Sequence, residues 1–172
     1  EYSADHLDGR WVIRTNWNAK NFKLMQAEGD AVFDRAQWVD LIPHDEAVLI
    51  EGVQLFKGFM AIDQRAKGLS SLRIRLADGS ELPVASDESA YTMGLSVNAE
   101  PDTDWLRYSY TSMTTPMSTY ELNIRTGERK LLKEQPVLGG FDKANYVTER
   151  LWAPARDGVQ VPVTVLYRKD FQ

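Results

Sequence analysis

The strongest constraint on the fold of this chain is a pair of apolar, strand-like runs that recurs along it. The first run of each pair occupies residues 11–14, 59–62 and 106–109, and the second begins at Phe22, Leu72 and Tyr120. The pair returns after roughly 48 residues, which lies in the range of propeller blades. The spacing therefore predicts a chain built from repeated small sheets.

The third copy specifies its strands most clearly. Residues 120–124 alternate apolar and polar side chains, and Thr126-Gly127 then turns the chain back, which is the pattern of a β-hairpin. In the second copy residues 72–76 alternate in the same way, Asp78-Gly79 supplies the turn, and the returning strand contains Pro83. Proline cannot donate a ladder hydrogen bond, so this last strand is expected at the outer edge of its sheet.

Further strands complete each unit. We expect them at residues 10–15, 22–27 and 38–42 in the first unit, at 47–56 and 59–63 in the second, and at 91–97 and 105–112 in the third. A short helix over residues 32–41 is the alternative to the strand at 38–42, because the spacing of the apolar residues there does not distinguish the helical period from the strand period. The expected fold is all-β: a partial propeller of about three four-stranded antiparallel blades, at residues 1–46, 47–88 and 89–135.

Residues 136–172 fall outside the repeat. Residues 134–142 are rich in turn formers, and two strands at 146–156 and 159–168 flank Asp157-Gly158 to form a hairpin with valines on one face. A closed propeller needs about four to eight blades. We therefore expect the chain to be a piece of a longer protein, whose further sequence closes the ring, or else that copies of the chain cover each other's exposed sheet faces.

Composition narrows the function. The chain has 20 Lys and Arg against 25 Asp and Glu, with a net charge of −5 and no cysteine. The absence of a basic stripe disfavours a nucleic-acid partner, and the absence of cysteine excludes a thiolate zinc site and a cysteine nucleophile. No apolar stretch approaches the roughly 20 residues of a membrane span, so no membrane partner is expected. The lack of cysteine fits a reducing compartment, and we expect a cytoplasmic location.

Few residues suggest a catalytic, metal-binding or cofactor-binding site. The two histidines, His6 and His44, have no partner at ligand spacing and are interpreted as surface residues. Several aspartates lie next to turn formers, and Asx-type turns account for them: Asp5, Asp8, Asp30, Asp45, Asp78, Asp102 and Asp104. We expect no metal or cofactor site.

The hydroxyl-bearing residues do not form a catalytic pattern. A serine hydrolase elbow needs Gly-x-Ser-x-Gly, which is absent, and Ser70-Ser71 after Gly68 lacks the second glycine. A cluster of hydroxyls in the third unit is interpreted as local backbone hydrogen bonding: Ser109, Ser112, Ser118, Thr111, Thr114 and Thr115. Four tryptophans, Trp11, Trp38, Trp105 and Trp152, are expected to fill space between sheets, whereas the role of Trp17 in its polar loop stays open.

Five stretches carry a family resemblance. They read YTSMTTP at 110–116, TYEL at 119–122, TGER at 126–129, NYVTERLWA at 145–153 and ARDGVQVPV at 155–163, and RTNW with KNFKLM at 14–25 extends the likeness. Together they resemble the prolyl oligopeptidase family of serine peptidases, and within it the trypsin-like oligopeptidase B (protease II) group. The resemblance covers nearly the whole chain.

The resemblance implies a seven-bladed propeller that caps an α/β-hydrolase domain, admits short peptides and allows cleavage after Arg or Lys by a Ser-Asp-His triad. It also implies that the ends of the inner strands line a channel, and that residues 136–172 hold the linker and first strands of the hydrolase domain. The family's triad lies beyond this chain, so no catalytic residue is assigned here. The alternatives are a stand-alone binding or scaffold module that assembles through exposed sheet faces, and a carbohydrate-active enzyme supported only by abundant carboxylates.

Overall fold

The computed structural model describes residues 1–171, and strands dominate them. The first unit is an antiparallel sheet in the order β1-β2-β3-β4, with strands β1 (Tyr2–Leu7), β2 (Arg10–Thr15), β3 (Lys23–Glu28) and β4 (Val39–Ile42). Two 3-10 helices, η1 (Gly29–Phe33) and η2 (Arg35–Gln37), join β3 to β4. The expected strand at 38–42 is therefore present as β4, and the helical structure before it is limited to the two short 3-10 helices.

The second and third units follow the expected order. The second contains β5 (Val48–Leu55), β6 (Phe59–Ala66), β7 (Leu69–Leu76) and β8 (Glu81–Pro83), and the third contains β9 (Tyr91–Leu95), β10 (Trp105–Ser112), β11 (Ser118–Asn123) and β12 (Arg129–Glu134). Neighbours within each unit pair antiparallel, and β8 pairs only with β7. A single parallel bridge between Ser70 and Thr92 joins the two units into one eight-stranded sheet. The strand that carries Pro83 is an outer edge, as predicted.

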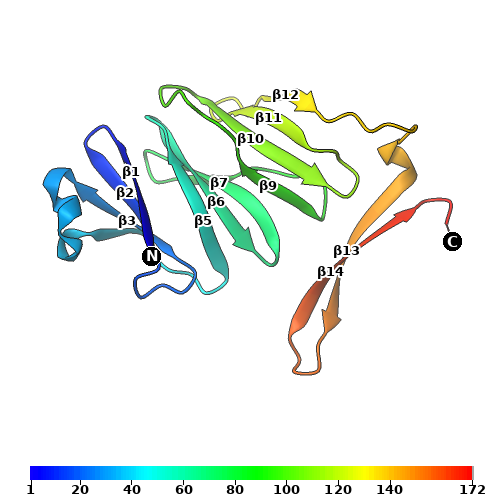
Figure 1. Ribbon diagram of the computed structural model, residues 1–172, viewed down its shortest axis with the longest axis horizontal. Coiled ribbons are helices and arrows are strands. Elements are labelled where there is room, and N and C mark those ends of the chain that lie inside the picture. The colour runs from blue at the N-terminus through cyan, green and yellow to red at the C-terminus, as the bar shows by residue number, and fades with distance from the viewer. Residues whose placement is uncertain (172) are drawn as a thin grey trace.

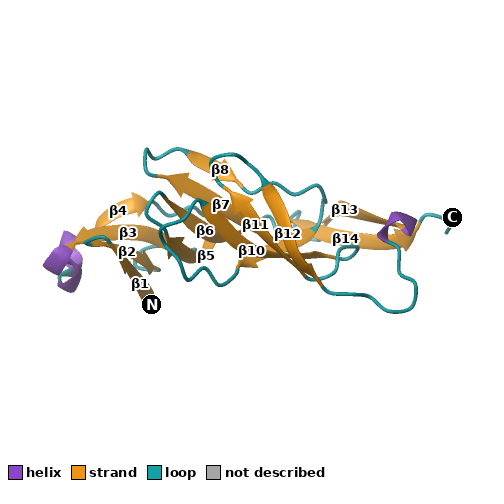
Figure 2. Cartoon of the chain, turned by 90° about the horizontal axis from the view of Figure 1, so that it is seen from above, coloured by secondary structure: helices purple, strands orange, loops and turns teal. Residues whose placement is uncertain are grey.

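The C-terminal part is a separate hairpin. Helix η3 (Lys143–Asn145) leads into β13 (Tyr146–Pro154), which pairs with β14 (Gln160–Arg168) in continuous antiparallel register. Figure 1 shows the three units side by side along the longest axis and the hairpin apart from them near the C-terminus. Figure 2 shows β8 at one edge of the second unit and the same hairpin at one end of the molecule.

The units pack through alternating side chains of their strands. On β6, Met60 and Ile62 face a core shared with Val12 and Leu24 of the first unit. The other parity of β6, which includes Phe59, faces a second core shared with the third unit. Because a strand points successive side chains to opposite faces, one central strand holds both neighbours. The all-β partial propeller predicted from the repeat is confirmed, whereas the exact divisions at residues 46, 88 and 135 stay predictions.

Two details differ from expectation. Strand β1 was not predicted, because its residues are mostly exposed and lack an apolar alternation. Trp152 was expected to pack between sheets but is 47% exposed, since the β13–β14 hairpin has no covering layer within residues 1–171. The other three strand tryptophans are half-buried. No helix in residues 1–171 has the length and apolar character needed to cross a membrane.

Candidate functional site

The loops of the three units gather at two ends, because antiparallel strands reverse direction at each turn. We define the hairpin end as the end that carries the β6–β7 turn, which the Arg150 guanidinium of β13 contacts by donating to the Lys67 carbonyl. The β10–β11 loop and the β8–β9 loop lie at this same end. The far end carries the β1–β2, β5–β6 and β7–β8 turns.

A glycine makes the contact between the hairpin and the second unit possible. Gly68 has φ +75°, and a Cβ at this position would lie 3.2 Å from Arg150 Nη2 and 3.3 Å from Pro162 Cγ. A second contact comes from Ser89 Oγ, which donates to the Thr148 carbonyl at 3.4 Å. The hairpin is therefore seated closely on the β6–β7 turn, at a position where the positive φ and the nearby Arg150 and Pro162 side chains favour glycine.

Replacing Gly68 with alanine is expected to loosen this seat. The added methyl would push against Arg150 and Pro162, so the amides of β13 should exchange with deuterium several-fold faster. Gly127→Ala is the matched control, because Gly127 has φ +74° but nothing within 4 Å of its added Cβ. Both variants place a Cβ in the left-handed region and carry a similar backbone strain of about 1–2 kcal/mol. Equal exchange of β13 in the two proteins would contradict the proposed seat.

A carboxylate ringed by hydroxyls lies at the hairpin end of the third unit. Glu88 accepts hydrogen bonds from Tyr110 Oη, from Ser112 Oγ and Thr114 Oγ1 at 2.6 Å each, and from Thr115 Oγ1 at 3.0 Å. Tyr110, Thr114 and Thr115 are buried. The β8–β9 loop is thus fixed to the end of β10 by one side chain.

Burial alone would raise the pKa of Glu88, but its hydrogen bonds from Ser112, Thr114, Tyr110 and Thr115 outweigh burial and hold the pKa below its usual value. Burial and the bond to Glu88 in turn raise the pKa of Tyr110. A carboxylate that already accepts four hydrogen bonds is a poor general base. The cluster is suited to holding a loop in place.

A second polar region is formed by the first strands of the three units. Residues of β1 and β5, the end of β9 and the loop that follows β9 line one cavity of about 440 Å³. Within it Gln54 and Asn98 form two hydrogen bonds: Gln54 Nε2 donates to the backbone carbonyl of Asn98 at 2.8 Å, and the Asn98 side chain donates through Nδ2 to Gln54 Oε1 at 3.1 Å. Asp5 also lines the cavity, and burial raises its pKa.

The residues singled out from the sequence are dispersed. His6 lies on β1 with its ring centroid 4.6 Å from that of Trp11, and His44 Nε2 accepts from the backbone N–H of Asn21 at 3.2 Å. Asp45 and Asp78 accept from backbone amides two residues on, as Asx turns do. Asp5, in contrast, lies within a strand and not in a turn. In residues 1–171 no group of three or more His, Asp or Glu side chains is placed to hold a metal ion.

The hydroxyl cluster behaves as predicted only in part. Ser109 Oγ donates to the Gly94 carbonyl and Thr111 Oγ1 to the Thr115 carbonyl, which is backbone bonding. Ser118 Oγ donates to the Pro116 carbonyl, and Ser112 Oγ accepts from the backbone amides of Thr114 and Thr115, as predicted. Ser112, Thr114 and Thr115 also donate to Glu88, a convergence that sequence reasoning missed. Trp17, left open before, is half-buried and has the Arg35 guanidinium 4.5 Å from its ring centroid.

Comparison with known proteins assigns the family. Residues 1–135 match the family model described as the N-terminal β-propeller domain of prolyl oligopeptidase. The chain belongs to this family. The matched range ends after β12, so the β13–β14 hairpin lies outside the propeller domain as the family defines it.

Individual members of this family are similar to the chain in sequence and in structure. The chain is 58% identical over 172 residues to dipeptidyl aminopeptidase BI of Pseudoxanthomonas mexicana, covering 99% of this chain and 24% of the relative. It is 31% identical to protease 2 of Moraxella lacunata over 96% of this chain and 24% of that protein. Oligopeptidase B from Trypanosoma brucei superposes with a TM-score of 0.83 at 31% identity, covering 100% of this chain and 26% of that one. The same enzyme from Leishmania major gives a TM-score of 0.85 at 28% identity, covering 100% and 25%.

The chain thus spans about a quarter of the length of these relatives. The resemblance to the prolyl oligopeptidase family and its oligopeptidase B group, stated from the sequence, is confirmed. What the relatives do as whole proteins is a separate question.

Proposed function

We propose that this propeller segment forms the last blades of a serine-type oligopeptidase that cleaves short peptides after Arg or Lys. In this proposal the segment restricts access to a catalytic α/β-hydrolase domain and supports it, and is inactive alone. The observation that carries the proposal is the hairpin seated at one end of the blades by Gly68 and Arg150. A hairpin that leaves the repeat and exposes Leu151, Trp152 and Val161 is suited to packing against a further domain.

In this proposal, substrate peptides would reach the catalytic domain by passing along the first strands of the blades. The cavity lined by β1, β5 and β9 carries Asp5, His6 and the Gln54–Asn98 amide pair. In a closed ring such strands surround the central passage, and a negative group on the wall would favour basic peptides. Size selection follows because a passage of this kind excludes folded proteins.

The test compares the full-length protein with the isolated 1–172 chain. The full-length protein is expected to hydrolyse an N-blocked fluorogenic peptide with Arg before the scissile bond, and to prefer it over the matched Ala peptide by more than about a hundredfold. A folded protein with exposed arginines should stay intact. The isolated chain should give neither turnover nor labelling by a serine-directed phosphonate. Labelling of the isolated chain would remove the proposal.

A second activity is favoured by one observation, the 58% identity to a dipeptidyl aminopeptidase. That name describes release of dipeptides from a free amino terminus. Two fluorogenic Arg peptides that differ only in a free or acetylated amino terminus separate the two activities. Cleavage restricted to the free terminus would assign the dipeptidyl activity, and cleavage of both would assign the oligopeptidase.

The stand-alone scaffold alternative predicts self-association through exposed sheet faces. Light scattering of the 1–172 chain over a dilution series measures it, and a monomer at all concentrations argues against obligate assembly. A cytoplasmic location is part of our proposal, and cell fractionation with an antibody to the chain tests it.

A further inference from the structure

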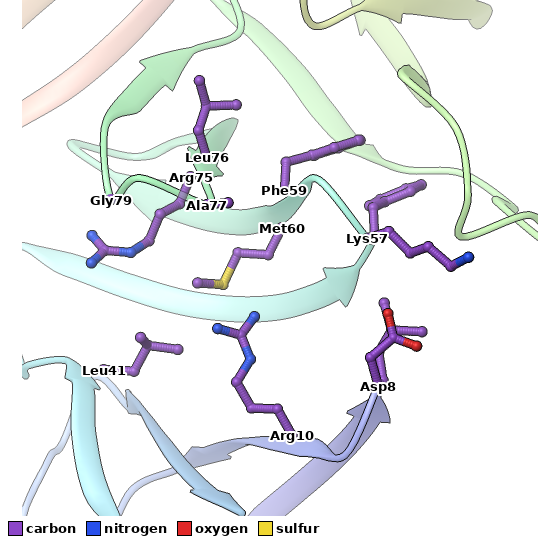
Figure 3. Close-up of a pocket in the computed structure, with 12 residues that line it drawn as sticks. Asp8, Arg10, Leu41, Lys57, Phe59, Met60, Arg75, Leu76, Ala77 and Gly79 are labelled. Carbon is purple, nitrogen blue, oxygen red and sulfur yellow. The ribbon is translucent and has the colours of Figure 1, made fainter.

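A pocket of about 340 Å³ opens at the far end, between the first and second units. It is lined by three turns, those that join β1 to β2, β5 to β6 and β7 to β8, together with Leu41 of β4. Figure 3 shows Arg10 reaching from its strand toward Met60, with Leu41 on one side and Asp8 on the other. Both units needed to form this pocket are present in the chain.

One wall of the pocket is apolar. It is formed by the half-buried side chains of Leu7 and Leu41 together with Met60. Met60 lies on the face of β6 that packs against the first unit, whereas Phe59 points to the opposite face and belongs to the core shared with the third unit. The pocket therefore offers a small apolar surface beside its charged rim.

The rim of the pocket is positively charged. Arg10, Lys57 and Arg75 line it against one carboxylate, Asp8, in a chain whose net charge is −5. Among residues 1–171 no ion pair involves Arg10. Lys57 pairs with the exposed Asp102 at 2.8 Å.

The charge of Arg75 is also incompletely balanced. Arg75 Nη1 lies 2.9 Å from Glu81 Oε1, and Arg73 Nη1 lies 2.8 Å from Glu81 Oε2. Two guanidinium groups thus share one carboxylate. An additional negative charge would be favourable at this rim.

We propose that this pocket binds a carboxylate carried by an apolar group, the chemistry of the C-terminal residue of a peptide. The carboxylate would lie at Arg10, whose planar guanidinium can bind it through two parallel hydrogen bonds, and the apolar side chain would lie against Leu7, Leu41 and Met60. A volume of this size suits one or two residues. An inorganic anion would leave the apolar wall unused. The choice of a peptide as the source of the carboxylate rests on the proposed function.

The test uses the full-length protein after reaction with a serine-directed phosphonate, so that a catalytic site does not contribute. Isothermal titration calorimetry would compare N-acetylphenylalanine, its uncharged amide, N-acetyl-Ala-Ala-Phe and inorganic phosphate. The free acid and the peptide are expected to bind at least about tenfold more tightly than the amide or phosphate. Arg10→Gln should weaken the acid about tenfold or more, Arg10→Lys should retain part of the affinity, and Arg125→Gln should leave it unchanged.

Each outcome is decisive. Equal binding of acid and amide, equal binding of phosphate, or an unaffected Arg10→Gln protein would overturn the site. Binding of the free acid without the peptide would overturn the peptide source alone. Because the readout is binding to a blocked protein, a failure of the proposed peptidase activity would appear in the turnover assay and not here. Arg10 is exposed, and a thermal unfolding curve for each variant verifies that it folds.

Discussion

Leu24→Ala is expected to lower the free energy of unfolding by about 3 kcal/mol, the usual cost of emptying a fully buried leucine site. Leu24 is 0% exposed and lies in the core that the first unit shares with Ile50, Met60 and Ile62 of the second. Removing it leaves a cavity at the contact between two sheets. Chemical denaturation followed by tryptophan fluorescence measures the loss.

The control for this substitution is Leu82→Ala, since Leu82 is 44% exposed on the edge strand β8. Its loss should stay within about 0.5 kcal/mol. A Leu24→Ala protein that loses no more than the Leu82→Ala protein would mean that the two units are not packed as described.

Glu88→Ala is expected to cost about 3 kcal/mol at neutral pH. The substitution leaves the hydroxyls of Tyr110, Thr114 and Thr115 buried without their acceptor, and an unsatisfied buried polar group costs roughly 1–3 kcal/mol. Glu46→Ala is the control, because Glu46 is exposed in the β4–β5 loop. Thermal or chemical unfolding of the three proteins gives the comparison.

The same carboxylate gives a pH dependence of defined sign. The pKa of Glu88 is lower in the folded protein than its usual value of 4.5, so its contribution to stability is present above that value and is lost as the pH falls through the folded pKa. The difference in stability between the native protein and Glu88→Ala should therefore shrink below about pH 4.5. A difference that stays constant from pH 7 to pH 3 would contradict the assignment.

The strands could be predicted because each is half-buried and alternates within a few residues. Residues 72–76 bury Leu72 and Ile74 and leave the two arginines between and after them less buried, and this pattern is local. Strand β1 escaped prediction because its exposure has no such period. Its place in the first sheet is set by pairing with β2.

The sites could not be predicted because they depend on contacts between distant residues. Glu88 is 22 to 27 positions from the hydroxyls that bind it, and in the sequence it is one more acid in a Ser-rich loop. Arg10, Lys57 and Arg75 meet only because two sheets pack side by side. The resemblance to a family identified the domain but carried no information about either cluster.

Two outer edges of the sheets are protected against strand addition. Strand β8 is three residues long and ends at Pro83, which has no amide hydrogen to offer an incoming strand. Strand β12 begins with Arg129 and Lys130, whose charges repel a second copy. These two edges therefore resist intermolecular strand addition, which leaves the broad sheet faces as the surfaces that pack against neighbouring blades.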